Sequence, residues 1–170
     1  ARADEGVRAL VLSSTDHMGL SAGADVRERL DEAGAVRRME LFAELYDELL
    51  KAADALTADE SDGIANMANV SALLWQFLPN LNWAGFYRMI GGGLVLGPFQ
   101  GKSACIRIPL DKGVCGAAAR TGATQLVADV HAFPGHIACD AASRSELVVP
   151  VKRDGAVIAV IDLDSPLPGR

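Results

Sequence analysis

The sequence predicts an α+β fold, with N-terminal helices followed by a mostly antiparallel sheet. Two observations predict it: apolar side chains recur at helical spacing up to residue 78, and short strand-like segments separated by glycine turns follow from residue 83. A long connection interrupts the strands before the last two. We expect residues 33–170 to form the domain and residues 1–32 to be an extension whose structure the pattern does not define.

Two helices are predicted in the first half of the chain, over residues 36–56 and 64–78. Their apolar side chains recur every three or four positions, which is typical of a helix face that packs on a core. Ser61 is a plausible N-cap of the second helix, and Pro79 ends it. Part of the first helix could instead face a second subunit, so a homodimer is plausible.

The strands are predicted in the second half, and a short helix over residues 113–120 interrupts them. Gly122 closes that helix, and a long connection over residues 129–143 precedes the last hairpin. We expect a closing helix after the last strand to be missing from this chain. The predicted strands cover residues 83–90, 94–96, 104–108, 125–128, 146–152 and 156–164.

Composition excludes several function classes. The 170 residues fit one domain, and 16 Lys and Arg against 22 Asp and Glu give a net charge of −6, which argues against a nucleic-acid partner. No apolar run approaches the roughly 18 residues that a membrane span needs. Three cysteines are too few for a secreted disulfide scaffold, so we expect a reducing, cytoplasmic location with buried or reactive thiols.

Acidic residues at the last hairpin form the first candidate site. If residues 153–155 make a three-residue loop, Glu146 lies opposite Asp162 at about 5 Å, and Asp164 lies on the same face. Repulsion and partial burial would then raise at least one carboxyl pKa, which suits ammonium binding and proton donation. A two-residue turn would instead place Asp162 on the face opposite Glu146. Acids at a strand end can also simply face water.

The three cysteines form the second candidate site. Cys105 lies within a predicted strand, Cys115 lies near the start of the predicted short helix, and Cys139 lies in the long connection beside His136. A helix N-terminus stabilises a thiolate, and an accessible thiol beside a histidine is a better nucleophile than a strand cysteine. Each cysteine taken alone could be a small buried hydrophobe. Together they could resolve a sulfenic acid, which requires a second thiol.

Trp83 and Tyr87 are four residues apart on one predicted strand and therefore share a face, with Gly85 between them leaving room. They could belong to the sheet core, or they could form an aromatic wall for a cation or a thioether.

The long connection contains residue types that bind metals, including His131, His136 and Cys139. Their spacing does not match a structural zinc site, and the chain has no CxxC motif, so we expect no metal. The two histidines are better interpreted as residues that organise the loop.

Six motifs carry a resemblance to a known family: NWAGFY at 82–87, LGPFQGK at 96–102, ACIRIP at 104–109, GVCG at 113–116, GHIACDAAS at 135–143 and IDLDS at 161–165. Residues 33–170 resemble the free methionine-(R)-sulfoxide reductases, small cytosolic enzymes built on a GAF domain. The resemblance implies a GAF-like fold, in which N-terminal helices pack on one face of a central, mostly antiparallel sheet and a loop covers a pocket on the other.

The resemblance implies thiol-dependent reduction of free L-methionine (R)-S-oxide to L-methionine. The family's reaction proceeds through a cysteine sulfenic acid and an intramolecular disulfide. Thioredoxin, served by an NADPH-dependent thioredoxin reductase, recycles the disulfide, and no cofactor is bound. Cys139 matches the attacking nucleophile, and Cys105 and Cys115 match the recycling thiols. Because family members differ in which cysteine attacks, Cys115 stays a candidate.

The resemblance also assigns the substrate contacts. The family's substrate-binding acids match Glu146, Asp162 and Asp164, with Glu146 as the proton donor. The family's aromatic wall matches Trp83 and Tyr87. The backbone around Ile137 and Ala138 lines the pocket. Two other functions stay open: a non-catalytic GAF module that binds a small molecule, and a thiol redox sensor.

Overall fold

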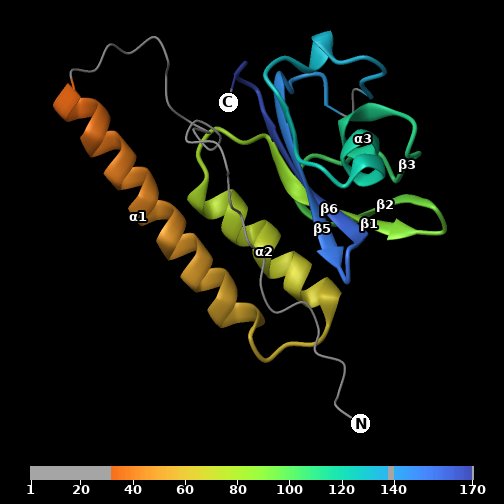
Figure 1. Ribbon diagram of the computed structural model, residues 1–170, viewed down its shortest axis with the longest axis horizontal. Helices are drawn as coiled ribbons and strands as arrows, with labels where there is room; N and C mark the ends of the chain where they lie inside the picture. The colour runs from red at the N-terminus through yellow and green to blue at the C-terminus, as the bar shows by residue number, and fades with distance from the viewer. Residues whose placement is uncertain (1–31, 138–139, 170) are drawn as a thin grey trace.

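The computed structural model describes residues 32–137 and 140–169, in which a six-stranded sheet separates helices α1 and α2 from helix α3 (Figure 1). The predicted extension over residues 1–32 lies outside the described residues, apart from its last position. The helical elements are α1 (Glu32–Thr57), α2 (Gly63–Phe77), α3 (Gly113–Thr121) and the 3-10 turn η1 (Val130–Ala132). The strands are β1 (Trp83–Ile90), β2 (Gly93–Gly101), β3 (Arg107–Ile108), β4 (Gln125–Val127), β5 (Ser145–Arg153) and β6 (Ala156–Ser165).

The sheet order is β3-β2-β1-β6-β5-β4, and each of these neighbouring pairs is antiparallel. Strands β1, β6 and β5 are interior strands of this sheet, and each contributes residues to the buried clusters on both faces. This arrangement confirms the predicted α+β class.

One face of the sheet packs against α2, and α1 packs on the outside of α2 (Figure 1). Its core contains Leu74 from α2 and Ile161 from β6, both nearly inaccessible to solvent. On α1 the side chain of Leu49 is buried, whereas Val36 and Leu56 are 52% and 48% exposed, so the periodic stripe predicted for this helix is only partly a core face.

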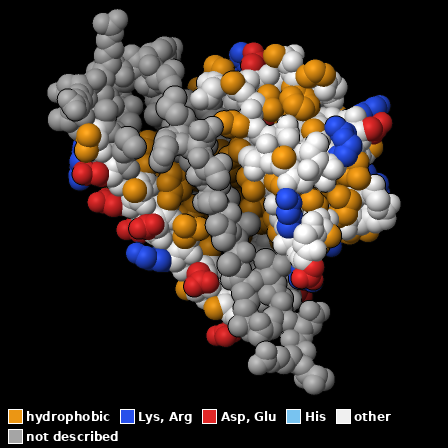
Figure 2. All heavy atoms as spheres, in the orientation of Figure 1, with side chains coloured by type: hydrophobic (Ala, Val, Ile, Leu, Met, Phe, Trp, Pro, Cys, Tyr) orange, Lys and Arg blue, Asp and Glu red, His pale blue; other side chains and the backbone are white. Residues whose placement is uncertain are grey.

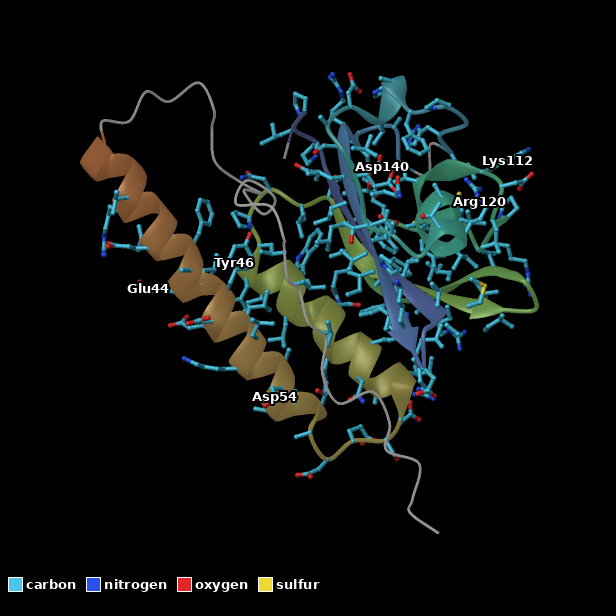
Figure 3. The ribbon with its side chains drawn as sticks, viewed as in Figure 1. Glu44, Tyr46, Asp54, Lys112, Arg120 and Asp140 are labelled. Atoms are coloured by element: carbon cyan, nitrogen blue, oxygen red, sulfur yellow. The ribbon has the colours of Figure 1, made fainter. Side chains whose placement is uncertain are left out.

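The orientation of α1 is visible in the side chains. Tyr46 points from α1 toward α2, and Glu44 points away from it (Figure 3). Acidic side chains follow the outer side of α1 (Figure 2). No helix in the described ranges has both the length and the apolarity to cross a membrane.

The N-cap of helix α2 lies one residue later than predicted. The N-cap is Asp62, not Ser61, because the Asp62 carboxylate accepts hydrogen bonds from the backbone amides of Ile64 (2.7 Å) and Ala65 (3.1 Å). The helix ends at Phe77, one residue before the predicted end, and Pro79 follows its C-cap Leu78.

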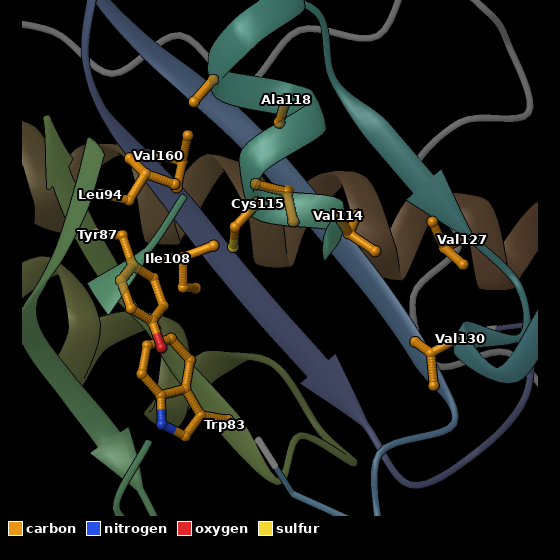
Figure 4. Close-up of a cluster of buried hydrophobic side chains, with 12 residues drawn as sticks. Trp83, Tyr87, Leu94, Ile108, Val114, Cys115, Ala118, Val127, Val130 and Val160 are labelled. Atoms are coloured by element: carbon orange, nitrogen blue, oxygen red, sulfur yellow. The ribbon is translucent and has the colours of Figure 1, made fainter. Parts of the chain in front are cut away.

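The other face of the sheet packs against α3. A buried cluster there joins Val114 and Cys115 of α3 to Val148 of β5 and Val160 of β6 (Figure 4). Gly116 allows the loop at Pro109 to pack closely on α3, because a Cβ at that position would lie 2.6 Å from the carbonyl oxygen of Pro109.

The predicted strand over residues 104–108 is wrong in extent. Strand β3 contains only Arg107 and Ile108, and Cys105 lies in the connection before it. β3 is an edge strand that pairs with Leu94 and Val95 of β2. Ala104 and Cys105 pack against the α3-side cluster from this connection, whereas Ile106 is exposed.

The hairpin between β5 and β6 has a two-residue turn, which is one of the two turns that the sequence left open. Asp154 and Gly155 have φ values of 51° and 80°, and Arg153 pairs with Ala156. Two consecutive positive φ values are typical of a type I′ turn, which Asp-Gly favours because its twist matches that of the strands.

A β-bulge next to this turn places the acids on one face of the sheet. Lys152 pairs with Val157, but Val151 pairs with Ala159, so Ile158 is the extra residue. Beyond the bulge the register places Glu146 opposite Asp164, not opposite Asp162. The predicted pairing is therefore wrong, but the predicted sharing of one face is confirmed.

Replacing Gly85 by Ala is expected to destabilise the protein by about 1–3 kcal/mol through overpacking. The added Cβ would lie 2.7 Å from the Trp83 ring and 2.8 Å from Phe99 Cα, so backbone must move. Urea denaturation measures the loss. Gly63→Ala is the matched control, because no atom lies within 4 Å of its Cβ position and Ala favours the helix. Equal stability of the two variants would contradict the packing described around Gly85.

Candidate active site

Three carboxyl groups gather on the α3 side of the β5–β6 hairpin. Glu146 of β5 pairs with Asp164 of β6, and Asp162 lies two residues from Asp164 on the same strand and face. Glu146 and Asp162 are only 7% and 6% exposed. Carboxyl groups are rarely this buried unless they are paired with a cation or retain their protons.

Helix α3 places a thiol against these acids. Cys115 lies in the first turn of α3, is 3% exposed, and its Sγ lies 3.9 Å from Glu146 Oε1 (Figure 4). Gly113 starts the helix with a φ of 69°, and its amide donates to the Gly135 carbonyl. This bond ties the start of α3 to the long connection that precedes β5.

Burial and mutual repulsion keep protons on this cluster. Desolvation, followed by the charge of Asp164, raises the pKa of Glu146 to about 8. Desolvation, followed by the charge of Asp162, raises the pKa of Asp164 to about 8. The pKa values of Asp162 and Cys115 are also raised, mainly by desolvation. The group can therefore donate a proton near neutral pH.

The acids and the thiol line one pocket, which also takes residues from the start of α3 and from the long connection. The pocket lining that the structure describes contains no Lys or Arg. Desolvation lowers the pKa of His136, which leaves this ring neutral at pH 7. The pocket therefore favours a ligand with a positive charge. Its lining is Ile108, Gly113, Val114, Cys115, His136, Ile137, Asp140, Ser143, Glu146, Asp162 and Asp164.

Hydrogen bonds attach the end of the long connection to the sheet. Asn82 donates from Nδ2 to Ser143 Oγ (2.9 Å) and to Asp140 Oδ2 (3.3 Å). Lys102 forms a 3.2 Å ion pair with Asp140. The backbone amide of Ala142 and the Lys102 ammonium lower the pKa of Asp140, so this carboxylate is an ionised anchor. Asp140 lies on the same side of the sheet as α3 (Figure 3).

Cys105 and Cys115 lie in different environments. Cys115 is a free, buried thiol, whereas Cys105 is half-buried, packs against the α3-side cluster and is disulfide-bonded. Cys139 and Ala138, predicted to attack and to line the pocket, lie outside the described residues. Ile137 and Asp140, which flank them in the sequence, both line the pocket.

The aromatic pair is buried beside the acids. Trp83 stacks on Tyr87 at 5.7 Å between ring centroids and on Phe99 at 5.3 Å, and Trp83 Nε1 donates to the Lys102 carbonyl. Neither Trp83 nor Tyr87 is among the described lining residues of the pocket. The room expected beside Gly85 is filled by the Phe99 side chain and the Trp83 ring. Substrate contact by this pair stays a prediction.

Sequence reasoning missed the anchoring role of Asn82, Asp140 and Ser143. All three stand in the motifs at 82–87 and 135–143, so the signal was present, but no periodicity shows that these two distant segments meet. His131 fulfils the predicted role of a loop-organising residue, because its Nδ1 and its backbone amide both contact Asp129 Oδ1, at 3.0 and 3.1 Å.

The buried acids are expected to make stability fall as pH rises from about 5 to about 8. Folded Glu146 and Asp164 keep protons up to about pH 8, whereas their ordinary values are 4.5 and 3.8, so the folded state binds more protons in this interval. Each retained proton contributes a slope of up to about 1.4 kcal/mol per pH unit. Urea denaturation across this range should show a shallower slope for Glu146→Gln.

Asp59→Asn is the matched control, since Asp59 is an exposed acid far along the chain from the cluster. This variant should keep the slope of the parent protein. A Glu146→Gln slope equal to that of the parent would show that Glu146 is ionised in the folded state.

Comparisons with known proteins agree on one family for this chain. The GAF domain family model matches residues 67–169. The free methionine-R-sulfoxide reductase of Escherichia coli is 51% identical over 127 residues, which span 75% of this chain and 77% of the reductase. The enzyme of the same name from Saccharomyces cerevisiae is 40% identical over 155 residues, which span 86% of this chain and 84% of that one.

A solved structure agrees with the sequence matches. The structure of fRMsr of Staphylococcus aureus in complex with substrate superimposes with a TM-score of 0.69 at 51% identity, covering 72% of this chain and 80% of that chain. The fold, the arrangement of acids and thiol, and these identities place the chain in one family. It belongs to the GAF domain proteins and, among them, to the free methionine-R-sulfoxide reductases.

Proposed function

We propose that this chain reduces free methionine-R-sulfoxide to methionine with a cysteine thiol as the reductant. The observation that carries the proposal is the group formed by the buried Glu146 and Asp162 and the partly buried Asp164, which lines one pocket with the Cys115 thiol. The names of its relatives and the substrate complex of the Staphylococcus aureus protein support the same substrate.

The ammonium group of the free amino acid binds to the carboxyls. The described lining offers no competing Lys or Arg, and a cation close to Asp162 and Asp164 would relieve the repulsion between them. With the ammonium held there, the methyl sulfoxide extends toward the long connection that carries Cys139. A methionine within a peptide lacks this ammonium, which accounts for a preference for the free amino acid.

Glu146 supplies the proton for the reduction. Its raised pKa keeps it protonated at neutral pH, so it can protonate the sulfoxide oxygen. The Cys139 thiolate attacks the sulfur of the protonated sulfoxide and forms a sulfur–sulfur bond, and the oxygen leaves as hydroxide. Hydroxide then adds to the Cys139 sulfur and breaks the sulfur–sulfur bond, which leaves a sulfenic acid on Cys139. The substrate sulfur gains two electrons, the cysteine sulfur loses two, and methionine leaves.

The electrostatics favour Cys139 over Cys115 as the nucleophile. Desolvation and the neighbouring acids raise the pKa of Cys115, so it stays a thiol, and only a thiolate attacks well. This argument favours Cys139 among the two candidates that the sequence left open.

A second thiol then condenses with the sulfenic acid to give a disulfide and water. The disulfide-bonded state of Cys105 supports it as this resolving residue, with Cys115 as the second recycling candidate. A thioredoxin dithiol returns the disulfide to two thiols, and NADPH-dependent thioredoxin reductase regenerates thioredoxin. The cytoplasm supplies this reductant, and the cycle needs no bound cofactor. A homodimer through α1, where Val36, Leu41 and Leu56 are exposed, stays a prediction.

Cys139→Ser is expected to abolish methionine release from free methionine-R-sulfoxide, because serine cannot replace the attacking thiolate. Cys105→Ser should lose most thioredoxin-supported turnover but keep part of the activity with dithiothreitol, which can reduce a sulfenic acid directly. Chromatographic detection of methionine measures both.

Cys115→Ser is the matched control and should keep the attack step. Retained activity in Cys139→Ser, together with loss in Cys115→Ser, would assign the nucleophile to Cys115. Stoichiometric thiol oxidation without methionine release would instead identify a redox sensor.

Acetylation of the substrate nitrogen is expected to lower kcat/KM by about 10- to 100-fold, because hydrogen bonds to charged groups contribute about 1.5–3 kcal/mol. The N-acetyl and free forms of methionine-R-sulfoxide are compared in the same assay. The methyl ester, which keeps the ammonium and blocks the carboxylate, is the control and should lose less. An equal loss for both derivatives would contradict ammonium binding by the acids.

A further inference from the structure

We propose that Cys115, Glu146 and Asp162 form a binding site for a thiophilic divalent cation, of which Zn²⁺ is representative, and that the bound cation inhibits the reductase. The ligand atoms of these three residues, one sulfur and two carboxylate oxygens, all lie within 4.8 Å of one another. The cation is not a cofactor in this proposal. It occupies the place of the substrate ammonium, and this second part rests on the proposed function.

The spacing of the three side chains suits a small cation. A tetrahedral zinc with sulfur at about 2.3 Å and oxygen at about 2.1 Å separates these two ligand atoms by about 3.6 Å. Cys115 Sγ and Glu146 Oε1 are already 3.9 Å apart. Small side-chain rotations are therefore enough to close the site. Asp164, which lines the same pocket, or a water molecule is available as the fourth ligand.

An unsatisfied buried oxygen points to a missing ligand. Asp162 is 6% exposed, and its Oδ1 is inaccessible and has no hydrogen-bond partner in the structure. A buried carboxylate oxygen without a donor costs free energy, which a bound cation would recover. Asp162 also lines the pocket, so a cation that enters the pocket lies beside this carboxyl group.

The mixed ligand set selects the metal. A thiolate with two carboxylates favours zinc or cobalt over magnesium and calcium, which take oxygen ligands. Binding involves no redox change: the cation displaces the thiol proton and any carboxyl protons into solvent. No spacing rule in the sequence identifies this site, because its ligands come from α3, β5 and β6.

Cobalt binding to reduced, metal-free protein tests the site. The Cys105→Ser, Cys139→Ser double variant keeps only the Cys115 thiol. We expect it to bind one Co²⁺ per chain with a thiolate-to-cobalt charge-transfer band, and to bind Zn²⁺ in equilibrium dialysis but not Mg²⁺. Adding Cys115→Ser should remove the band and weaken Zn²⁺ binding by more than about 100-fold, and Asp162→Asn should weaken it as well. Far-ultraviolet circular dichroism checks that each variant is folded.

Two results would overturn the metal site: no charge-transfer band in the double variant, or a band that survives removal of Cys115. Saturating free methionine should displace Zn²⁺, whereas N-acetylmethionine should not. Zinc that binds but is not displaced by methionine would overturn the inhibition. The metal site would then be independent of the proposed substrate position, so the two failures are distinguishable.

Discussion

The clustering of three carboxyl groups on one face of the β5–β6 hairpin, two of them buried and Asp164 partly buried, is the constraint on which the rest of the site depends. Removing these groups from water costs free energy, and their proximity prevents them from all being ionised together. The hairpin has strands on both sides, its residues share a buried cluster with α2 on one face, and α3 packs on the other face. A surface hairpin would leave the same acids solvated, with ordinary acidity and no capacity to donate a proton at neutral pH.

The pocket contains two kinds of carboxyl group with opposite tasks. Glu146 and Asp164 have raised pKa values and retain protons, whereas Asp140 has a lowered pKa and stays charged. The difference comes from their surroundings, because Asp140 accepts a backbone amide bond and faces the Lys102 ammonium. Separation of acidities within one site is the usual way in which a protein divides proton donation from structural anchoring.

The sequence predicted the fold class well because each signal for it is local. The apolar spacing of α2, the Gly122 C-cap and the strand at residues 83–90 each appear within one short segment. The extent of β3 and the exposure of α1 could not be read in this way, because both depend on which partner covers the segment. The ladder at β3 pairs with only two residues of β2, and α1 lies outside α2 instead of on the sheet.

The candidate site was predicted only in part, and the β5–β6 hairpin shows why. Two errors cancelled: the turn is one residue shorter than assumed, and Ile158 adds one residue as a bulge. The acids therefore share a face as predicted, although Glu146 pairs with Asp164. The contact of Asn82 with the end of the long connection joins residues 58 and 61 positions apart, and no single-segment pattern encodes it.

Strand β6 serves two cores at once. Past its bulge, Ile161 and Leu163 pack toward α2, and they alternate with Asp162 and Asp164, which face the pocket. Neighbouring side chains of this strand therefore have different roles: those on one face pack in an apolar core, and those on the other face form the site. A backbone shift of β6 that repacks Ile161 and Leu163 against α2 also moves Asp162 and Asp164. The substitutions that this strand tolerates are therefore limited by the packing on both faces. Evolution can tune the reactive acids only within the narrow positional freedom that the opposite core allows.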